Sequence, residues 1–117
     1  DKGEMISVAP TDSLLVAYNR MRASDISQIP VLIEGNLKGV LDEEDLLFKV
    51  SKDPAAFSSE VSKHMIDQLD TLQFSASEDE LLSILSEGKV AIIFDQDTFI
   101  GFITKVDLIN YYRNKLN

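Results

Sequence analysis

The chain has 117 residues, enough for one ordinary domain or two very small ones. Its 11 basic and 20 acidic side chains give a formal net charge of −9, which disfavours binding to nucleic acid or to an anionic membrane surface. With no cysteine and one histidine, disulfides and multi-histidine metal sites are excluded. No apolar run is long enough to span a bilayer. We expect a cytoplasmic location, and a fragment of a longer protein because the first residue is Asp1.

The chain opens with an extended stretch over residues 6–8, which Pro10 ends. Thr11 and Asp12 follow as candidate N-caps of a helix, because their side-chain oxygens can accept hydrogen bonds from its free backbone N–H groups. One face of that helix is apolar at helical spacing, through Leu14, Ala17, Tyr18 and Met21.

A β-hairpin and a second helix are predicted next. Residues 30–34 favour a strand, residues 35–36 a turn, and residues 37–41 the returning strand. The helix begins at Asp42, and its apolar stripe is Leu46, Leu47 and Val50. Residues 51–60 lack periodicity and are interpreted as a linker.

The second half of the chain repeats this order of elements. Ser77 is the predicted N-cap of its first helix, and Glu80 stands at the spacing of a capping box. The apolar stripe of that helix is Leu81, Ile84 and Leu85. The other predicted elements are strands over residues 71–74, 90–94 and 98–103 and a final helix over residues 104–115.

Matching sequence blocks show that the two halves are repeats. Residues 39–47 and 101–109 share a glycine, an apolar pair and an aspartate at the same spacing. Residues 30–33 match residues 91–94, and Met5 matches Met65. A unit of about 55 residues is marginal alone, so we expect one α+β module of two pseudo-symmetric β-α-β-β-α repeats packed sheet to sheet. The expected boundaries are 1–50 for repeat 1, 51–60 for the linker and 61–117 for repeat 2.

This pattern resembles the cystathionine β-synthase (CBS) domain, and the tandem is similar to a CBS pair, or Bateman module. The resemblance spans essentially the whole chain and rests on residues 29–32 and on the two glycine blocks. Residues 101–108 match the family hallmark Gly-h-h-Thr-x-x-Asp-Leu, where h is apolar. Within the family, the chain is most similar to the C-terminal regulatory region of cystathionine β-synthase.

The resemblance implies a regulatory, ligand-sensing module with no catalytic residue, metal or cofactor of its own. Its expected partners are a second copy, in a homodimer formed through the helices near Leu46, Leu108 and Tyr112, and an upstream catalytic domain that uses pyridoxal phosphate. One alternative is an AMP- or ATP-sensing CBS pair of another enzyme, channel or transporter. Another is a purely structural dimerisation module.

The resemblance also implies an adenosine-containing ligand in a cleft between the repeats. Thr104 and Asp107 lie one helical turn apart, and the Asp107 carboxylate can accept hydrogen bonds from both hydroxyls of a ribose. The alternative role of this pair is to cap the last helix. The residues expected around the base of the ligand are Ile6, Ser7, Ile26, Ser27, Gln28 and Ile29.

A second, weaker site is implied at the pseudo-symmetric position. Here Asp42 replaces the threonine, and two carboxylates one turn apart would repel a phosphate; the alternative is an acidic first turn favoured by the helix dipole. The residues of this site are Asp42, Asp45, Lys89, Val90 and Ala91. Because no cation stands beside Ser27 and Gln28, S-adenosylmethionine is favoured over AMP or ATP. His64 is expected to have a surface or capping role.

Overall fold

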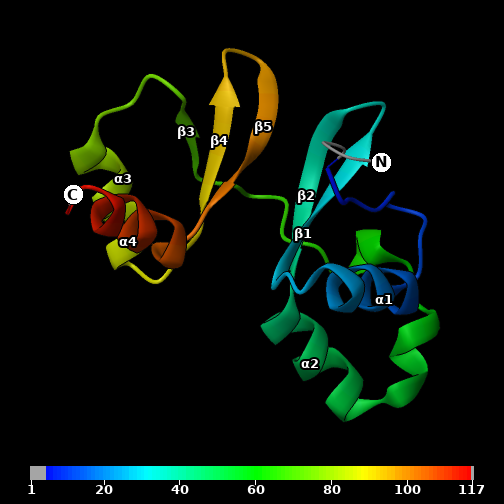
Figure 1. The fold of residues 1–117 in the computed structure, drawn as a ribbon. Coiled ribbons are helices and arrows are strands. Elements are labelled where there is room, and N and C mark those ends of the chain that lie inside the picture. Colours follow the sequence, from blue (N-terminus) through cyan, green and yellow to red (C-terminus); the bar gives the residue numbers. More distant parts are fainter. Residues whose placement is uncertain (1–4, 117) are drawn as a thin grey trace. The chain divides into compact units, whose positions relative to one another are not determined.

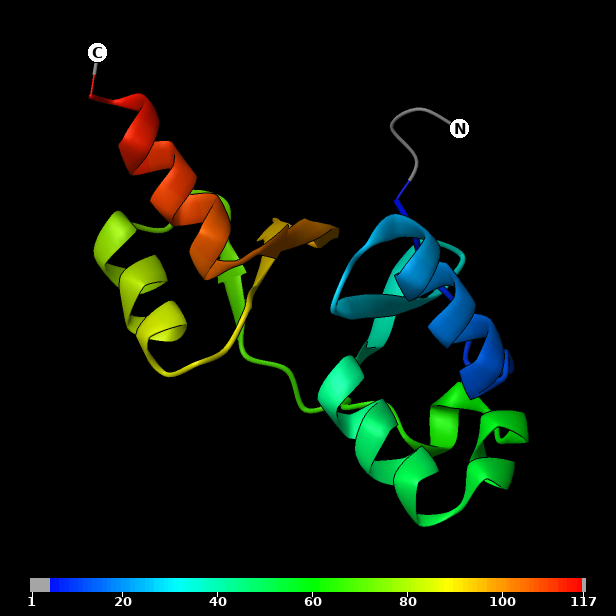
Figure 2. The same ribbon diagram turned by 60° about the horizontal axis from the view of Figure 1, so that its bottom comes forward.

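The computed structural model describes residues 5–116, and the chain divides into two compact units, Asp1–Gln68 and Leu69–Asn117. In each unit two helices lie against a small sheet (Figures 1 and 2). The order of helices and strands repeats between the units, which confirms the predicted α+β class. The packing of the two repeats sheet to sheet stays a prediction.

The first unit contains two helices, one hairpin and two short 3-10 turns. Its elements are α1 (Leu14–Ser24), β1 (Gln28–Ile33), β2 (Asn36–Asp42), α2 (Glu43–Lys52), η1 (Pro54–Ser58) and η2 (Val61–Lys63). The expected opening strand is reduced to a single parallel bridge between Val8 and Val31.

Helix α1 is capped by Ser13, and not by Thr11 or Asp12 as predicted. The Ser13 hydroxyl accepts a hydrogen bond from the Val16 N–H at 3.2 Å. The Asp12 carboxylate instead accepts from the Ala9 N–H at 2.8 Å, and so closes the turn that precedes the helix. Three consecutive polar residues, Thr11, Asp12 and Ser13, could each cap this helix. Because the Asp12 side chain closes the preceding turn, Ser13 takes the cap position.

The turn of the first hairpin falls on Glu34 and Gly35, one residue earlier than predicted. Both residues have positive φ, 50° and 82°. Two successive residues with positive φ are typical of the type I′ turn, whose twist matches that of the paired strands. Asn36 therefore begins β2 and pairs with Ile33.

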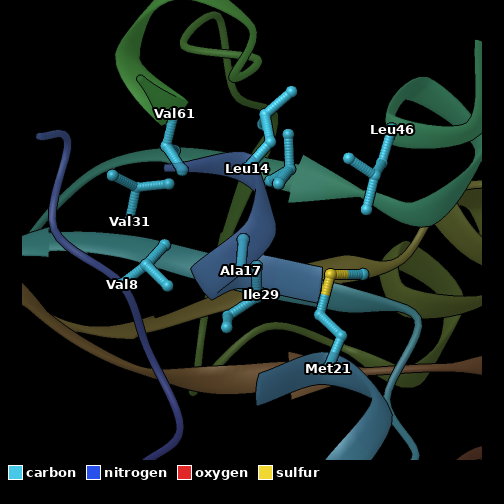
Figure 3. Close-up of a cluster of buried hydrophobic side chains, with 9 residues drawn as sticks. Val8, Leu14, Ala17, Met21, Ile29, Val31, Leu46 and Val61 are labelled. Carbon is cyan, nitrogen blue, oxygen red and sulfur yellow. The ribbon is translucent and has the colours of Figure 1, made fainter. Parts of the chain in front are cut away.

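The core of the first unit joins the apolar face of α1 to β1, β2 and α2 (Figure 3). Its buried members are Val8, Leu14, Ala17, Met21, Ile29, Val31, Leu41, Leu46 and Val61. Val50 packs against this core as predicted. Leu47 was expected in the same stripe but is 66% exposed, because it lies about 100° around α2 from Leu46.

The segment after α2 packs on the first unit and does not act as a spacer. The Val61 side chain is fully buried, and its N–H donates to the Asp12 carbonyl at 2.8 Å. The Leu14 N–H donates to the Ser59 carbonyl at 2.9 Å. The expected linker and the first residues of the expected second repeat are therefore part of the first unit's structure.

The same segment then covers the hairpin. Ile66 forms an antiparallel bridge with Val40, through backbone bonds of 2.8 and 2.9 Å in both directions. Gly39 lies directly under this crossing, where a Cβ atom would come within 2.7 Å of the Met65 sulfur and 2.9 Å of the Ile66 carbonyl. Glycine is required at position 39 because another part of the chain occupies the space of a side chain.

The second unit has a three-stranded sheet in the order β3-β4-β5, with β3 parallel and β5 antiparallel to β4. Its elements are β3 (Thr71–Gln73), α3 (Glu78–Ser86), β4 (Ala91–Asp95), β5 (Thr98–Ile103) and α4 (Lys105–Asn114). Its buried cluster is Leu85, Ala91, Ile93 and Leu108, with Leu81 and Ile84 packed against it. The capping box of Ser77 and Glu80 is confirmed.

The two hairpins share a β-bulge at corresponding positions. The register shifts after Val31 in the first hairpin and after Ile93 in the second, and these residues pair with Gly39 and Gly101 respectively. Val31 therefore corresponds to Ile93, and the sequence match of Val31 with Ile92 was wrong by one residue. The glycines fix the correct register.

Two neighbouring leucines of α1 test this description of the core. Leu14→Ala removes a fully buried side chain and should lower the free energy of unfolding by about 3 kcal/mol. Leu15→Ala is the matched control, since Leu15 is 47% exposed and should change stability by less than about 0.5 kcal/mol. Urea unfolding measures both, and equal effects would contradict the assignment of the α1 faces.

Candidate functional site

Thr104 and Asp107 form a reciprocal capping box at the start of α4. The Thr104 hydroxyl accepts from the Asp107 N–H at 3.3 Å, while Asp107 Oδ2 accepts from the Thr104 N–H at 2.8 Å and from its hydroxyl at 3.0 Å. The structure thus shows the capping role of this pair. Both bonds to the exposed Asp107 carboxylate fall on Oδ2, so Oδ1 is left for another donor in the part of the chain that the structure describes.

Asp42 is the N-cap of α2 and also lies across the first hairpin from Gln28. Its Oδ1 accepts from the Glu44 N–H at 2.7 Å, and its Oδ2 lies 3.5 Å from Gln28 Nε2. The structure therefore brings together two residues that the sequence assigned to different sites. Gln28 faces an acidic helix start within its own unit.

Of the residues expected around the base of the ligand, Ile29 has a side chain that cannot contact it. It is fully buried in the core of the first unit, so its side chain does not lie where a base could stack. Ile26 is half-buried and lines a small pocket of about 250 Å³ that also includes Glu43 and Leu46. Ser27 is exposed, and its carbonyl accepts from the Glu43 N–H at 2.9 Å.

Arg20 is a residue that the sequence argument missed. Ile6 and Ser7 line a pocket of about 300 Å³ together with Arg20, whose Nη1 donates to the Ser7 carbonyl at 2.8 Å. The same guanidinium lies 3.6 Å from Asp12. A cation therefore stands beside one expected ligand segment. The sequence places Arg20 on α1 about one helical turn after Ala17. That spacing could have indicated that its side chain reaches residues 6–8.

In the second unit, Lys89 takes part in ion pairs. Its ammonium lies 2.9 Å from the Asp70 carboxylate and 3.5 Å from that of Glu87. The hydrogen bond to Asp70 raises the pKa of Lys89 above its usual value. Val90 is half-buried, and Ala91, the first residue of β4, is fully buried. Lys89, Val90 and Ala91 therefore offer few free side-chain groups to a ligand at the expected second site.

Each expected site combines residues from both units. The first places Thr104 and Asp107 of the second unit with residues of the first, and the other places Asp42 and Asp45 of the first unit with residues of the second. The structure describes the two parts of each site separately, and the complete sites stay predictions.

Across residues 5–116, no group of three or more carboxylate, histidine or thiol side chains is placed to hold a metal ion. Over the same residues, no helix is both long enough and apolar enough to cross a membrane.

His64 ends the η2 turn, where its N–H donates to the Val61 carbonyl at 2.9 Å. Its Nε2 is hydrogen-bonded to the Ser59 hydroxyl at 2.9 Å, and its Nδ1 is buried without a partner in the described structure. Burial, followed by the positive charges of Lys49 and Lys63, lowers the pKa of His64. His64 therefore helps to hold the segment around Val61 in place, in its neutral form.

One protein-family model matches a segment within the first half of the chain. Residues 2–52 match the family model described as CBS domain. The Bacillus subtilis "CBS domain-containing protein YhcV" is 23% identical over 115 residues, covering 96% of this chain and 82% of its own length.

Solved structures share the fold over almost all of the chain. A CBS-domain protein from Agrobacterium tumefaciens superimposes with a TM-score of 0.84 at 22% identity, covering 93% of this chain and 90% of the other. A Methanocaldococcus jannaschii protein, described as a candidate archaeal homologue of γ-AMPK, gives a TM-score of 0.82 at 20% identity, covering 100% of this chain and 49% of the other.

The fold is that of CBS-domain proteins. The family match over residues 2–52 and the shared fold over both units support a pair of CBS domains. The narrower resemblance to the C-terminal region of cystathionine β-synthase is not shown by these relatives.

His64 makes the stability of the first unit depend on pH. Because its pKa is lowered from 6.5 by folding, the unfolded state binds more protons just below pH 6.5, and the free energy of unfolding should fall as the pH drops through that range. Above pH 6.5 this contribution is fully present. Urea unfolding between about pH 5.5 and 8 measures the effect.

His64→Gln is the control, because glutamine can still pair with Ser59 but does not titrate. This variant should show a flatter dependence over the same range. Since His64 is the only histidine of the sequence, its pKa can be followed directly by NMR. A measured pKa at or above 6.5 in the folded chain would contradict the burial of Nδ1.

Proposed function

We propose that the chain is a regulatory CBS module that binds an adenosine nucleotide. The observation that carries this proposal is the exposed capping box at the start of α4, where Asp107 holds Thr104 through one carboxylate oxygen. A charged acceptor on a rigid first helical turn suits a pair of ribose hydroxyls, since charge-assisted hydrogen bonds are the stronger ones.

Arg20 favours a phosphate-bearing ligand. The preference for S-adenosylmethionine depended on the lack of a cation beside Ser27 and Gln28. The Arg20 guanidinium lies instead beside Ser7, another residue expected around the base, and so supplies a cation that this preference did not consider. Arginine is well suited to phosphate because its planar group donates two parallel hydrogen bonds. The likeness to a candidate γ-AMPK homologue adds support from the fold.

S-adenosylmethionine remains the second candidate. Its sulfonium and amino groups prefer carboxylates, and Asp42 with the acidic first turn of α2 supplies several of them close to Gln28. The two ligands share adenosine, so both depend on a ribose acceptor. They differ in their need for Arg20.

Regulation would follow from linkage between ligand binding and conformation. A ligand shifts an equilibrium between two conformations by its difference in affinity for them, and a CBS module would pass that shift to the protein it controls. A cystathionine β-synthase-like parent with pyridoxal phosphate, and a homodimer formed through the helices, belong to this proposal. The domain composition of the full-length protein tests the first of these, and sedimentation of the chain tests the second.

A thermal-shift screen tests the ligand with AMP, ADP, ATP, S-adenosylmethionine and S-adenosylhomocysteine. Ligand at about 100 times its Kd should stabilise the chain by about 2.7 kcal/mol. Asp107→Asn keeps an acceptor for the capping box but removes the charge, and should weaken binding about 10- to 100-fold. Asp97→Asn, in the exposed turn between β4 and β5, is the matched control and should bind normally.

Arg20→Gln separates the two candidate ligands. Nucleotide binding should weaken in this variant, and binding of S-adenosylmethionine should not. If Asp107→Asn binds as tightly as the parent chain, Asp107 is not the ribose acceptor. If no compound stabilises the parent chain, ligand sensing is contradicted and dimerisation becomes the remaining function.

A further inference from the structure

The first unit holds a small pocket of about 250 Å³ where the end of α1 meets the start of α2. Met21 and Leu46, two buried core residues labelled in Figure 3, line its apolar part together with the half-buried Ile26. Its other lining residues are polar or charged: Tyr18, Arg22, Asp25 and Glu43. A cavity with an apolar part and a few converging polar groups is typical of small-molecule sites.

The charged groups of this pocket are free to bind a ligand. Within residues 5–116, the side chains of Arg22, Asp25 and Glu43 form no ion pair. The Arg22 Nη1 donates to the Tyr18 hydroxyl at 3.5 Å, which leaves the Nη2 group available. A guanidinium matches the two oxygens of a carboxylate. The pocket thus offers one partner for a carboxylate and, in the same cavity, two acceptors for a cationic group.

Asp25 stands at a backbone position that favours glycine. It follows α1 with φ 53° and ψ 48°, in the left-handed region, where helix ends usually carry glycine. This conformation strains a residue that has a Cβ atom, and a carboxylate is also unfavourable at the negative end of the helix dipole. Aspartate at this position therefore lowers the stability of the first unit, and packing does not explain its presence.

The internal repeat shows which lining residues the shared fold requires. The two repeats align through the N-caps of their first helices and through the bulges of their hairpins. In this alignment Leu85 takes the place of Met21, and Leu108 takes the place of Leu46. All four side chains are buried, so the apolar part of the pocket belongs to the core of the fold.

The charged lining residues, by contrast, are not repeated. Their counterparts are Ser86 for Arg22, Gly88 for Asp25 and Lys105 for Glu43. Gly88 is the residue with positive φ that follows α3, so the second unit has glycine where the first has Asp25. The second unit forms the same helices and hairpin without these three charges. The charges of the first unit therefore have no role in the shared fold.

Size and charge together define the class of ligand. Pockets for drug-sized ligands have volumes of about 300–1,000 Å³, so a cavity of about 250 Å³ suits a molecule smaller than a nucleotide. Two carboxylates disfavour a phosphate and suit an ammonium, whose three N–H groups can be shared between them. The single guanidinium suits a carboxylate, and the apolar part suits an aliphatic side chain. A free amino acid carries all three groups.

We propose that this pocket binds a free aliphatic α-amino acid, such as leucine or methionine. Its carboxylate pairs with Arg22 and its ammonium with Asp25 and Glu43, while its side chain lies in the apolar part of the pocket. All the lining residues belong to the first unit. The site goes beyond the proposed nucleotide function, because it depends on neither Arg20 nor Asp107. The chain would then sense two different small molecules.

An NMR titration of the labelled full chain with L-leucine, added up to about 10 mM, tests this proposal. Amide signals of Arg22, Ile26 and Glu43 should shift and reach saturation. Two analogues each remove one charged group: N-acetyl-leucine lacks the ammonium, and leucinamide lacks the carboxylate. Each should bind at least about tenfold more weakly, because each leaves a charged group of the pocket unpaired.

Asp25→Gly separates binding from folding. Glycine relieves the left-handed backbone, so Tm should rise by about 2–4 °C while leucine binding weakens at least about tenfold. A loss of binding in a more stable chain does not come from misfolding. Glu34→Gly is the matched control, because Glu34 also has a positive φ, 50°, but lies in the hairpin turn outside the pocket. This control should bind leucine normally.

Arg22→Gln tests the partner of the ligand carboxylate. Leucine should bind about tenfold more weakly to this variant, since the charge-assisted pair is lost. Leucinamide, which has no carboxylate, should bind the variant and the parent chain equally. If Arg22→Gln weakens both compounds to the same extent, Arg22 does not pair with the carboxylate and the proposed orientation is wrong.

Three further results would overturn the proposal. They are the absence of shifts at the highest leucine concentration, normal leucine binding by Asp25→Gly, and displacement of leucine by S-adenosylmethionine. The last would assign the pocket to the amino-acid part of the second candidate ligand. Nucleotide binding is measured separately, through Asp107→Asn and Arg20→Gln, so either function can fail without the other.

Discussion

Two helices on a hairpin bury an apolar layer between them, but in a unit of 50 to 70 residues one end of that layer stays open to water. In the first unit a segment from beyond α2 closes this end with Val61, and two hydrogen bonds from Val61 and Ser62 fix it there. The position of Gly39, the neutral His64 and the burial of Leu14 all depend on this closure. The second unit has the same layer with the same end open within the described residues.

The start of α4 combines a structural and a candidate binding role in one helical turn. Asp107 caps the helix, is the candidate ribose acceptor, and lines an open apolar pocket of about 560 Å³ between α3, α4 and the sheet of the second unit. A ligand at the carboxylate would therefore act on the helical turn that also borders the pocket.

Local sequence signals predicted the local structure well. Ser77 with Glu80, and Thr104 with Asp107, form the capping boxes that their spacing indicates, because each box is made of neighbours in sequence. The errors fall where several residues could serve equally. Asp12 competes with Ser13 for the cap of α1, and Leu47 competes with Leu46 for the buried face of α2.

By itself the sequence determined the α+β class, the repeat, the helices and both hairpins, since periodicity and turn residues act over a few positions. Only the tertiary structure decided that residues 59–66 complete the first unit, that Ile29 is inaccessible, and that Arg20 stands beside Ser7. Each of these depends on contacts between segments that are distant in sequence, and packing selects such contacts from many that local pattern allows equally.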